Sequence, residues 1–430
     1  MQNQRLNDLR LLLLAGGCSL GISAQAYDAG IDNTDWNFGG HGKYQYINTS
    51  IPENSVLQEA GGDVLQDHNL EFRLKASARR GHWEFNTHAQ LIKVHSDSLA
   101  VFAGLPGSIY PGADVMNDDR RWFNLTHEIS YKNKNATLVR LDRFNLSYTG
   151  QKTVVRFGRQ AISWGNGLMF TPMDILNPFD PTAVDREYKT GDDMLYTQYL
   201  FDNGNDLQAA VVVRRDPFTG DTDSGQSSLA LKIHGFWPGG EFDLLAAQHY
   251  GKTLLGLGLS GDMGEAIWRG DLVFNDTDSG AVYSAVGGLS YSWLGFGHNW
   301  TGLLEYYFNG FGQPDSDFSP GEISVNTDLL RRLTRGELYN IGRHYVGASV
   351  MLEATPLFNL TSNTFINLAD PSALAQLVIT YDWKQDIQLL AALNFPIGPD
   401  GTEYGGPDAG EPGLYLSTGP SLFAQLAWYF

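Results

Sequence analysis

Cysteine is almost missing from this chain of 430 residues, since Cys18 is the only one. A single thiol can build neither a disulfide framework nor a cysteine metal site, so neither is expected. Cys18 also falls inside a segment that looks removable on export, which would leave the mature protein without thiols. Such a chain suits passage through an oxidising compartment.

Long apolar runs and positive charge are scarce as well. After residue 26 no stretch stays apolar for about eighteen residues, so the sequence predicts no transmembrane helix. The 29 basic residues stand against 48 acidic ones, giving a net charge of -19. Nucleic-acid binding needs a basic surface and is not expected. No cofactor is predicted.

Residues 1–26 have the parts of a secretory signal peptide. Arg5 and Arg10 precede a short apolar core from Leu11 to Ile22, and Ala24-Gln25-Ala26 offers small residues for cleavage. Cys18 raises the alternative of a lipoprotein signal, although the residues before it lack the usual bulky apolar side chain. Residues 27–38 would then form a short periplasmic segment.

The last eleven residues, 420–430, alternate with a period of two, which is typical of a strand with one face in an apolar medium. One face carries Leu422, Ala424, Leu426, Trp428 and Phe430. Outer-membrane barrels place aromatic residues at the membrane interface and close the sheet with their last strand. This ending resembles the C-terminal assembly signal of bacterial outer-membrane proteins. The resemblance implies delivery to the barrel-assembly machinery.

Similar alternation recurs along the chain, for example over 70–79 and 83–91, on either side of a turn at Arg80-Gly81. These strands of about ten residues are longer than the five or six usual in soluble sheets. They match a tilted membrane crossing.

Connection length also alternates. Eight short turns separate nine outer connections that are often much longer, which predicts about eighteen strands, with sixteen as the rival count. The predicted fold class is all-β: a transmembrane antiparallel β-barrel over 39–430, with short periplasmic turns and long extracellular loops. Two segments stay open: 121–135 is either an extra strand or folded loop, and leucines over 325–340 favour a short loop helix.

A barrel of this size leaves an aqueous channel. Only about a dozen residues separate the predicted cleavage site from its first strand, too few for a plug domain, so a passive or weakly selective channel for small solutes is favoured. Strand phase directs six basic side chains inward: Arg73, Lys75, Arg156, Lys232, Arg269 and Arg343. Either they belong to an ordinary mixed-charge lumen, or they form a basic wall facing an acidic loop.

The acidic partner in the second interpretation is the third outer connection, 163–193. Three prolines stiffen it, and its acidic residues are Asp174, Asp180, Asp185, Glu187, Asp192 and Asp193. It resembles the porin loop that folds inward and constricts the pore, which would place Asp174, Asp180, Asp185 and Glu187 at the constriction. Calcium held by its first three aspartates is an alternative, but their spacing matches no EF-hand and no metal is predicted. An ordered external loop is the third possibility.

Small residues support insertion of that loop. Over 253–260 the leucines face lipid, while Gly256 and Gly258 face inward and leave room for another backbone to approach.

Residues 155–165 contain Gly158-Arg159-Gln160, a short spacer and Trp164-Gly165, followed by a loop rich in proline and asparagine. This run resembles uncharacterised porin-like barrels of Gram-negative bacteria and, distantly, alginate-export barrels. The resemblance implies a channel in the bacterial outer membrane, where the barrel contacts lipid. Acidic groups on the outer loops of such proteins usually meet lipopolysaccharide through divalent cations, or simply keep the surface solvated. Porin-like barrels often trimerise, so a homotrimer stays open.

Three other functions are weighed against the porin. A polysaccharide exporter would want a lining of one sign, which the mixed charges do not offer. A transporter of hydrophobic compounds would use inward apolar residues, namely Tyr196, Val212, Leu245, Val378 and Leu390. A hydrolase would need a Ser/His/acid constellation, and no Gly-x-Ser-x-Gly elbow accompanies the histidines. The chain is therefore predicted not to be an enzyme.

Overall fold

A computed structural model describes residues 34–103 and 117–430. The predicted signal peptide, with Cys18, and most of the segment 27–38 lie outside the described residues. Within the described residues no helix is long and apolar enough to cross a bilayer.

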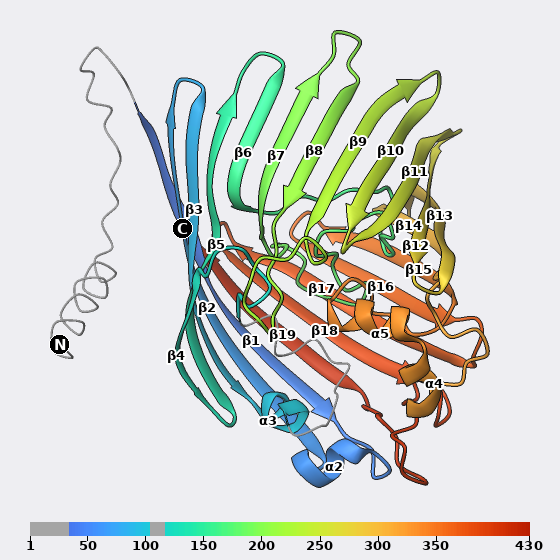
Figure 1. The fold of residues 1–430 in the computed structure, drawn as a ribbon. Coiled ribbons are helices and arrows are strands. Elements are labelled where there is room, and N and C mark those ends of the chain that lie inside the picture. The colour runs from blue at the N-terminus through green and yellow to red at the C-terminus, as the bar shows by residue number, and fades with distance from the viewer. Residues whose placement is uncertain (1–33, 104–116) are drawn as a thin grey trace, which may run out of the picture. The chain divides into compact units, whose positions relative to one another are not determined.

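Eighteen strands form one closed antiparallel sheet, because β1 pairs with β19 as well as with β2 (Figure 1). A further strand, β4 (Thr126–Lys132), pairs with the outer end of β5 beside this ring. The ring contains β1 (Asp35–Ser50), β2 (Val64–Arg80), β3 (Trp83–Ser96), β5 (Asn135–Thr149), β6 (Thr153–Gln160), β7 (Asp192–Leu200), β8 (Asp206–Val212), β9 (Ser228–Trp237), β10 (Gly240–His249), β11 (Lys252–Met263), β12 (Ala266–Thr277), β13 (Gly280–Gly295), β14 (His298–Phe308), β15 (His344–Thr355), β16 (Phe358–Asn367), β17 (Ser372–Lys384), β18 (Ile387–Ile397) and β19 (Ser421–Tyr429). The predicted barrel and its strand count are confirmed.

The C-terminal strand closes the sheet as predicted. β19 pairs with β1 from His41↔Tyr429 to Thr49↔Ser421. Beyond the ladder, the Gly40 amide donates to the Phe430 carbonyl at 2.9 Å, and the Phe430 amide donates back at 3.1 Å. The terminal residue therefore takes part in the seam.

Alternation sorts the side chains of each strand to two faces. On β2, Leu70, Phe72 and Leu74 are exposed, while Arg73 between them is 3 % exposed. Since the sheet is closed, the exposed apolar face must be the outside and the buried polar face the inside. The outside is suited to lipid, and the inside encloses polar contacts and the third outer loop.

The connections keep the predicted rhythm. The eight turns at one end are short. The nine connections at the other end include, within the described residues, four short helices: α2 (Val56–Gly61), α3 (Asp97–Ala103), α4 (Pro320–Val325) and α5 (Thr327–Thr334). The open segment 121–135 contains strand β4, and the predicted loop helix is α5. β1 begins at Asp35, inside the segment that we expected to precede the barrel.

The strands of the ring differ in length. β6, β7 and β8 have 8, 9 and 7 residues, whereas β5 has 15. The wall is consequently low at these three strands.

Candidate functional site

The connection between β6 and β7, residues 161–191, packs against the inner face of the barrel. We call it the β6–β7 loop; it begins and ends two residues before the predicted range. Its Trp164, Met173, Ile175 and Leu176 form one buried cluster with side chains of β7 to β12. Those wall residues are Met194, Tyr196, Ala210, Val212, Ala230, Leu245, Ala247, Leu254 and Val273. Burying this apolar area is the main force that holds the loop inside.

The glycine face of β11 is where the loop approaches the wall most closely. A Cβ atom on Gly256 would lie 3.1 Å from Met173 Cγ, and one on Gly258 would lie 2.4 Å from Asn166 Nδ2. Asp271 on the next strand accepts hydrogen bonds from the backbone N and Nδ2 of Asn166, at 2.8 and 2.9 Å. The expectation that these glycines make room for the loop is confirmed.

Glu305 on β14 fixes the next part of the loop. Its carboxylate, 1 % exposed, accepts from the backbone N–H groups of Leu168, Met169 and Phe170 at 2.6, 2.9 and 3.1 Å. Three consecutive amides aimed at one carboxylate form charge-assisted hydrogen bonds. The sequence offered a signal, since Glu305 is an acidic residue inside an apolar strand. Glu305 was nevertheless not among the residues predicted to line the pore.

The far end of the loop is held on the opposite wall. Lys43 on β1 lies 2.7 Å from Asp185 Oδ2 and 2.7 Å from Glu187 Oε2. The Tyr429 hydroxyl donates to Glu187 at 2.8 Å. Arg73 stacks over the Tyr188 ring at 4.0 Å, and Lys75 donates to the Tyr188 hydroxyl. The loop therefore crosses the interior from β12 and β14 to β1, β2 and β19.

The six predicted basic lining residues are used in different ways. Arg73 pairs with Glu71 and Asp142 at 3.1 and 2.8 Å, and Lys232 pairs with Asp243 at 2.9 Å. Arg156 and Arg269 donate to the hydroxyls of Ser147 and Ser290. Arg343 lies one residue before β15 and donates to the carbonyl of Gly312 in the β14–β15 loop.

The predicted acidic residues divide likewise. Asp174 is buried against Lys189 at 2.6 Å, so its charge is matched inside the loop. Asp185 and Glu187 are matched by Lys43, and Asp180 accepts from Thr182. Of the predicted basic residues, Arg73 and Lys75 contact the loop, and they do so through Tyr188. The acidic residues Asp174, Asp185 and Glu187 are instead matched by Lys189 and Lys43, which the predicted basic wall did not include. No metal-ligand cluster occurs among the residues that the structure describes.

Asp192 and Asp193 were expected in the loop, but they begin β7. Both are buried: Asp192 pairs with Arg214 at 2.7 Å and Asp193 with Arg159 at 2.8 Å. Their charge was the reason for placing them in the loop. An aspartate in a strand that pairs with a buried arginine cannot be distinguished by its residue type from an aspartate in a loop.

Two of the cavities beside the loop are lined by both Asp180 and Tyr339. One, of about 330 Å³, includes Arg121, Lys189, Arg214 and Arg335. The other, of about 470 Å³, includes Thr182, Asn394, Glu403 and Tyr404.

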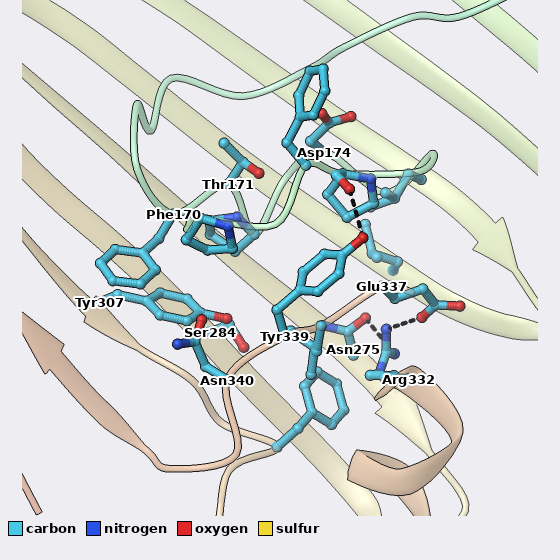
Figure 2. A pocket seen from close by; sticks show the side chains of 18 of the residues that line it. Phe170, Thr171, Asp174, Asn275, Ser284, Tyr307, Arg332, Glu337, Tyr339 and Asn340 are labelled. Carbon is cyan, nitrogen blue, oxygen red and sulfur yellow. Dashed lines mark hydrogen bonds and ion pairs between the residues drawn. The ribbon is translucent and has the colours of Figure 1, made fainter. Parts of the chain in front are cut away.

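Tyr339, from the β14–β15 loop, reaches the β6–β7 loop and donates to the Pro178 carbonyl at 3.1 Å (Figure 2). Below it, Arg332 of α5 donates to Glu337 at 2.8 Å. Burial alone would raise the pKa of Glu337, but Arg332, His249 and Arg335 together lower it to about 2. Through the contact between Tyr339 and Pro178, the β14–β15 loop and the β6–β7 loop meet over the lumen.

Glu403, in the loop between β18 and β19, is a candidate source of pH dependence. It accepts from the Tyr345 hydroxyl at 2.6 Å, Asn367 Nδ2 at 2.8 Å and the Ile341 amide at 3.0 Å. Burial, with nearby Asp370, nevertheless raises its pKa to about 7.

The pKa of Glu403 in the folded state lies above its ordinary value. The stabilisation that protonated Glu403 contributes to the folded state is therefore fully present below about pH 4.5. This contribution is lost as the pH rises to about 7. We expect a loss of about 2 kcal/mol, reduced for a partly hydrated carboxylate. Urea unfolding in micelles at pH 5 and pH 8 should show a smaller difference for E403Q than for wild type. E411Q, in the same loop, should keep the wild-type difference.

The Gly158-Arg159-Gln160 motif serves the wall rather than the pore. Gly158 has φ 117°, and a Cβ there would lie 2.2 Å from the Phe144 carbonyl oxygen. Arg159, 1 % exposed, pairs with Asp118 at 3.0 Å and Asp193 at 2.8 Å. Gln160 donates to the Met194 carbonyl. The motif joins β5, β6 and β7 to the segment 117–125.

No protein-family model matches the sequence, and no curated protein is significantly similar to it. Solved structures share its fold. OccAB1 of Acinetobacter baumannii has a TM-score of 0.54 at 9 % identity, covering 92 % of this chain and 96 % of that one. The outer membrane protein OpdK of Pseudomonas aeruginosa has a TM-score of 0.51 at 10 % identity, covering 92 % and 98 %. OccAB3 of Acinetobacter baumannii has a TM-score of 0.52 at 8 % identity.

These likenesses concern the fold. Closed antiparallel barrels with an even strand number and an apolar outer belt are the architecture of bacterial outer-membrane proteins. The chain is a barrel of this class, and the predicted outer-membrane location agrees with it. The likeness to alginate exporters finds no support among these structures.

Proposed function

We propose that this protein is an outer-membrane, porin-like channel for small polar solutes and ions, in which the β6–β7 loop narrows the lumen. One observation carries the proposal: the loop is anchored on both sides of the interior, by Glu305 and Asp271 on one wall and by Lys43 on the other. A chain segment stretched across an aqueous lumen must reduce its free cross-section.

The charge of the interior supports a polar rather than an apolar passage. Tyr196, Val212 and Leu245, the residues of the hydrophobic path considered above, are covered by the loop. The cavities beside it include arginine, lysine, aspartate and amide side chains among their lining residues, next to aromatic and aliphatic ones. A channel of this kind performs no chemistry, in keeping with the prediction that the chain is not an enzyme.

Planar-bilayer recording of the refolded barrel tests the proposal directly. We expect stable unitary currents in KCl and a reversal potential displaced from zero in a salt gradient. An absence of conductance from protein that is folded, as judged by its heat-dependent gel mobility, would refute the channel.

Asp180 offers a test of selectivity, because it lines both cavities and its carboxylate accepts from the amide and the hydroxyl of Thr182. D180N removes one negative charge beside the passage and should shift the reversal potential toward anions. D202N is the matched control, since Asp202 lies in the short β7–β8 turn, pairs with Lys152 of the β5–β6 turn and is 87 % exposed. Equal shifts in the two variants would place Asp180 outside the ion path.

Association with the barrel-assembly machinery through β19, contact of the acidic outer loops with lipopolysaccharide, and a homotrimer stay predictions. Chemical crosslinking of the protein in isolated outer membranes would test the homotrimer.

A further inference from the structure

The outside of the barrel has a deep apolar groove where the wall is low. Its cavity is about 400 Å³, within the ~300–1,000 Å³ range of ligand pockets. Strand residues Phe85, Phe144, Leu146 and Phe157 line it, with Trp122, Phe123 and Leu125 of the segment 117–125. Phe144, Leu146 and Phe157 lie on the lipid-facing side, being 42, 45 and 45 % exposed. The groove therefore opens toward the membrane.

The groove is held in shape by polar contacts behind it. Arg159 donates to the Phe123 carbonyl at 2.7 Å, and Asp193 accepts from the Phe123 amide at 2.7 Å. Asp118 accepts from the Leu125 amide at 2.7 Å. These bonds fix the backbone of the segment, so that the rings of Trp122 and Phe123 pack edge-on against Phe157, each at 6.1 Å. An aromatic wall built this way is preformed.

The depth of the groove can be read from the strands. Each strand residue rises ~3.3 Å along a strand tilted by ~40°, which gives ~2.5 Å of height. Phe157 is four residues past the start of β6, hence ~10 Å above the periplasmic edge. Arg215, which also lines the groove, lies three residues beyond the outer end of β8, whose 7 residues rise ~18 Å. The apolar belt is ~25 Å tall, so Arg215 lies near the outer headgroups.

The groove is apolar along its depth and carries a cation at the height of the lipid headgroups. This combination matches a molecule with a hydrocarbon chain and an anionic headgroup. Water does not fill an apolar cavity, whereas hydrocarbon does. Arg215 has no hydrogen-bond or ion-pair partner for its side chain in the described part of the chain. A guanidinium in this setting suits a phosphate, which it can bind with two parallel hydrogen bonds.

We propose that this groove binds a phosphorylated lipid of the outer leaflet, lipopolysaccharide, with one acyl chain along Phe157 and Phe123 and its phosphate on Arg215. The site is independent of the channel, since none of its apolar residues lines the lumen cavities.

The test replaces Phe157 with a photoreactive phenylalanine derivative in cells and measures adducts after irradiation. Leu244 is the matched position: it lies four residues past the start of β10 and is 46 % exposed, against 45 % for Phe157. We expect several-fold more lipopolysaccharide adduct from position 157 than from position 244. R215Q should reduce the yield at 157 to the level at 244, while the barrel keeps its folded gel mobility.

Three results would overturn the proposal: equal yields at 157 and 244, adducts at 157 that contain mainly phospholipid, or an R215Q variant with undiminished yield. If R215Q misfolds, F123A supplies the second test, because it opens the groove without removing a charge. A folded F123A protein with unchanged adduct yield would contradict the site equally.

Discussion

Replacing Glu305 with glutamine is expected to give larger and noisier single-channel currents. The wild-type carboxylate accepts from three consecutive amides of the β6–β7 loop and is 1 % exposed. Glutamine offers one carbonyl oxygen and a group that cannot accept, so at least one amide loses its partner. Hydrogen bonds to a charged group contribute ~1.5–3 kcal/mol each, so the local loss is on the order of 3 kcal/mol.

A loss of that size raises the detached fraction of this loop segment roughly 100-fold, since each ~1.4 kcal/mol is a factor of ten. Planar-bilayer recording would detect the detached state as a widened or fluctuating current.

E353Q is the matched control for this substitution. Glu353 is the same residue type on the neighbouring strand, but its carboxylate accepts from Asn299 Nδ2 at 3.1 Å and forms no hydrogen bond or ion pair with the β6–β7 loop within the described residues. We expect wild-type currents from E353Q. If E305Q also conducts as wild type while its barrel remains folded, the β6–β7 loop does not limit the current, and the proposed constriction is wrong.

The barrel could be predicted because its rules are local. Period-two alternation depends on which face of a strand meets lipid, and short turns depend on a few residues at each hairpin. For the same reason the last strand was correctly expected to close the sheet. Gly256 and Gly258 also gave a correct expectation, since a strand face without side chains leaves space for a neighbour.

The site was only partly predictable, because its decisive contacts join residues far apart in sequence. Glu305 meets Leu168 across 137 positions, and Lys43 meets Asp185 across 142. Periodicity indicates that such a residue points inward, but it does not indicate which atom of the loop the residue contacts. The acidic residues show this limit clearly: Asp174 and Asp193 look alike in sequence, yet one is paired within the loop and the other locks the wall.

Replacing Arg159 with alanine is expected to have the largest effect on stability of any single change considered. The guanidinium is 1 % exposed and lies 3.0 Å from Asp118 and 2.8 Å from Asp193, which are themselves buried. Alanine leaves both carboxylates without this partner, and breaking a buried pair costs roughly 3–5 kcal/mol. Lysine should not rescue, because it cannot reproduce the planar fork that reaches two carboxylates and the Phe123 carbonyl.

Urea unfolding in micelles, followed by heat-dependent gel mobility, measures this cost. R156A is the control: Arg156 lies three residues earlier on β6, is half-buried and donates to the Ser147 hydroxyl at 3.0 Å, so its loss should cost only about 1 kcal/mol. Removing all three charges together, in R159M with D118N and D193N, should recover part of the stability, because no buried charge is then left alone. Equal midpoints for R159A and R156A would mean that the wall at β6 does not depend on this pairing, and that the motif has another role.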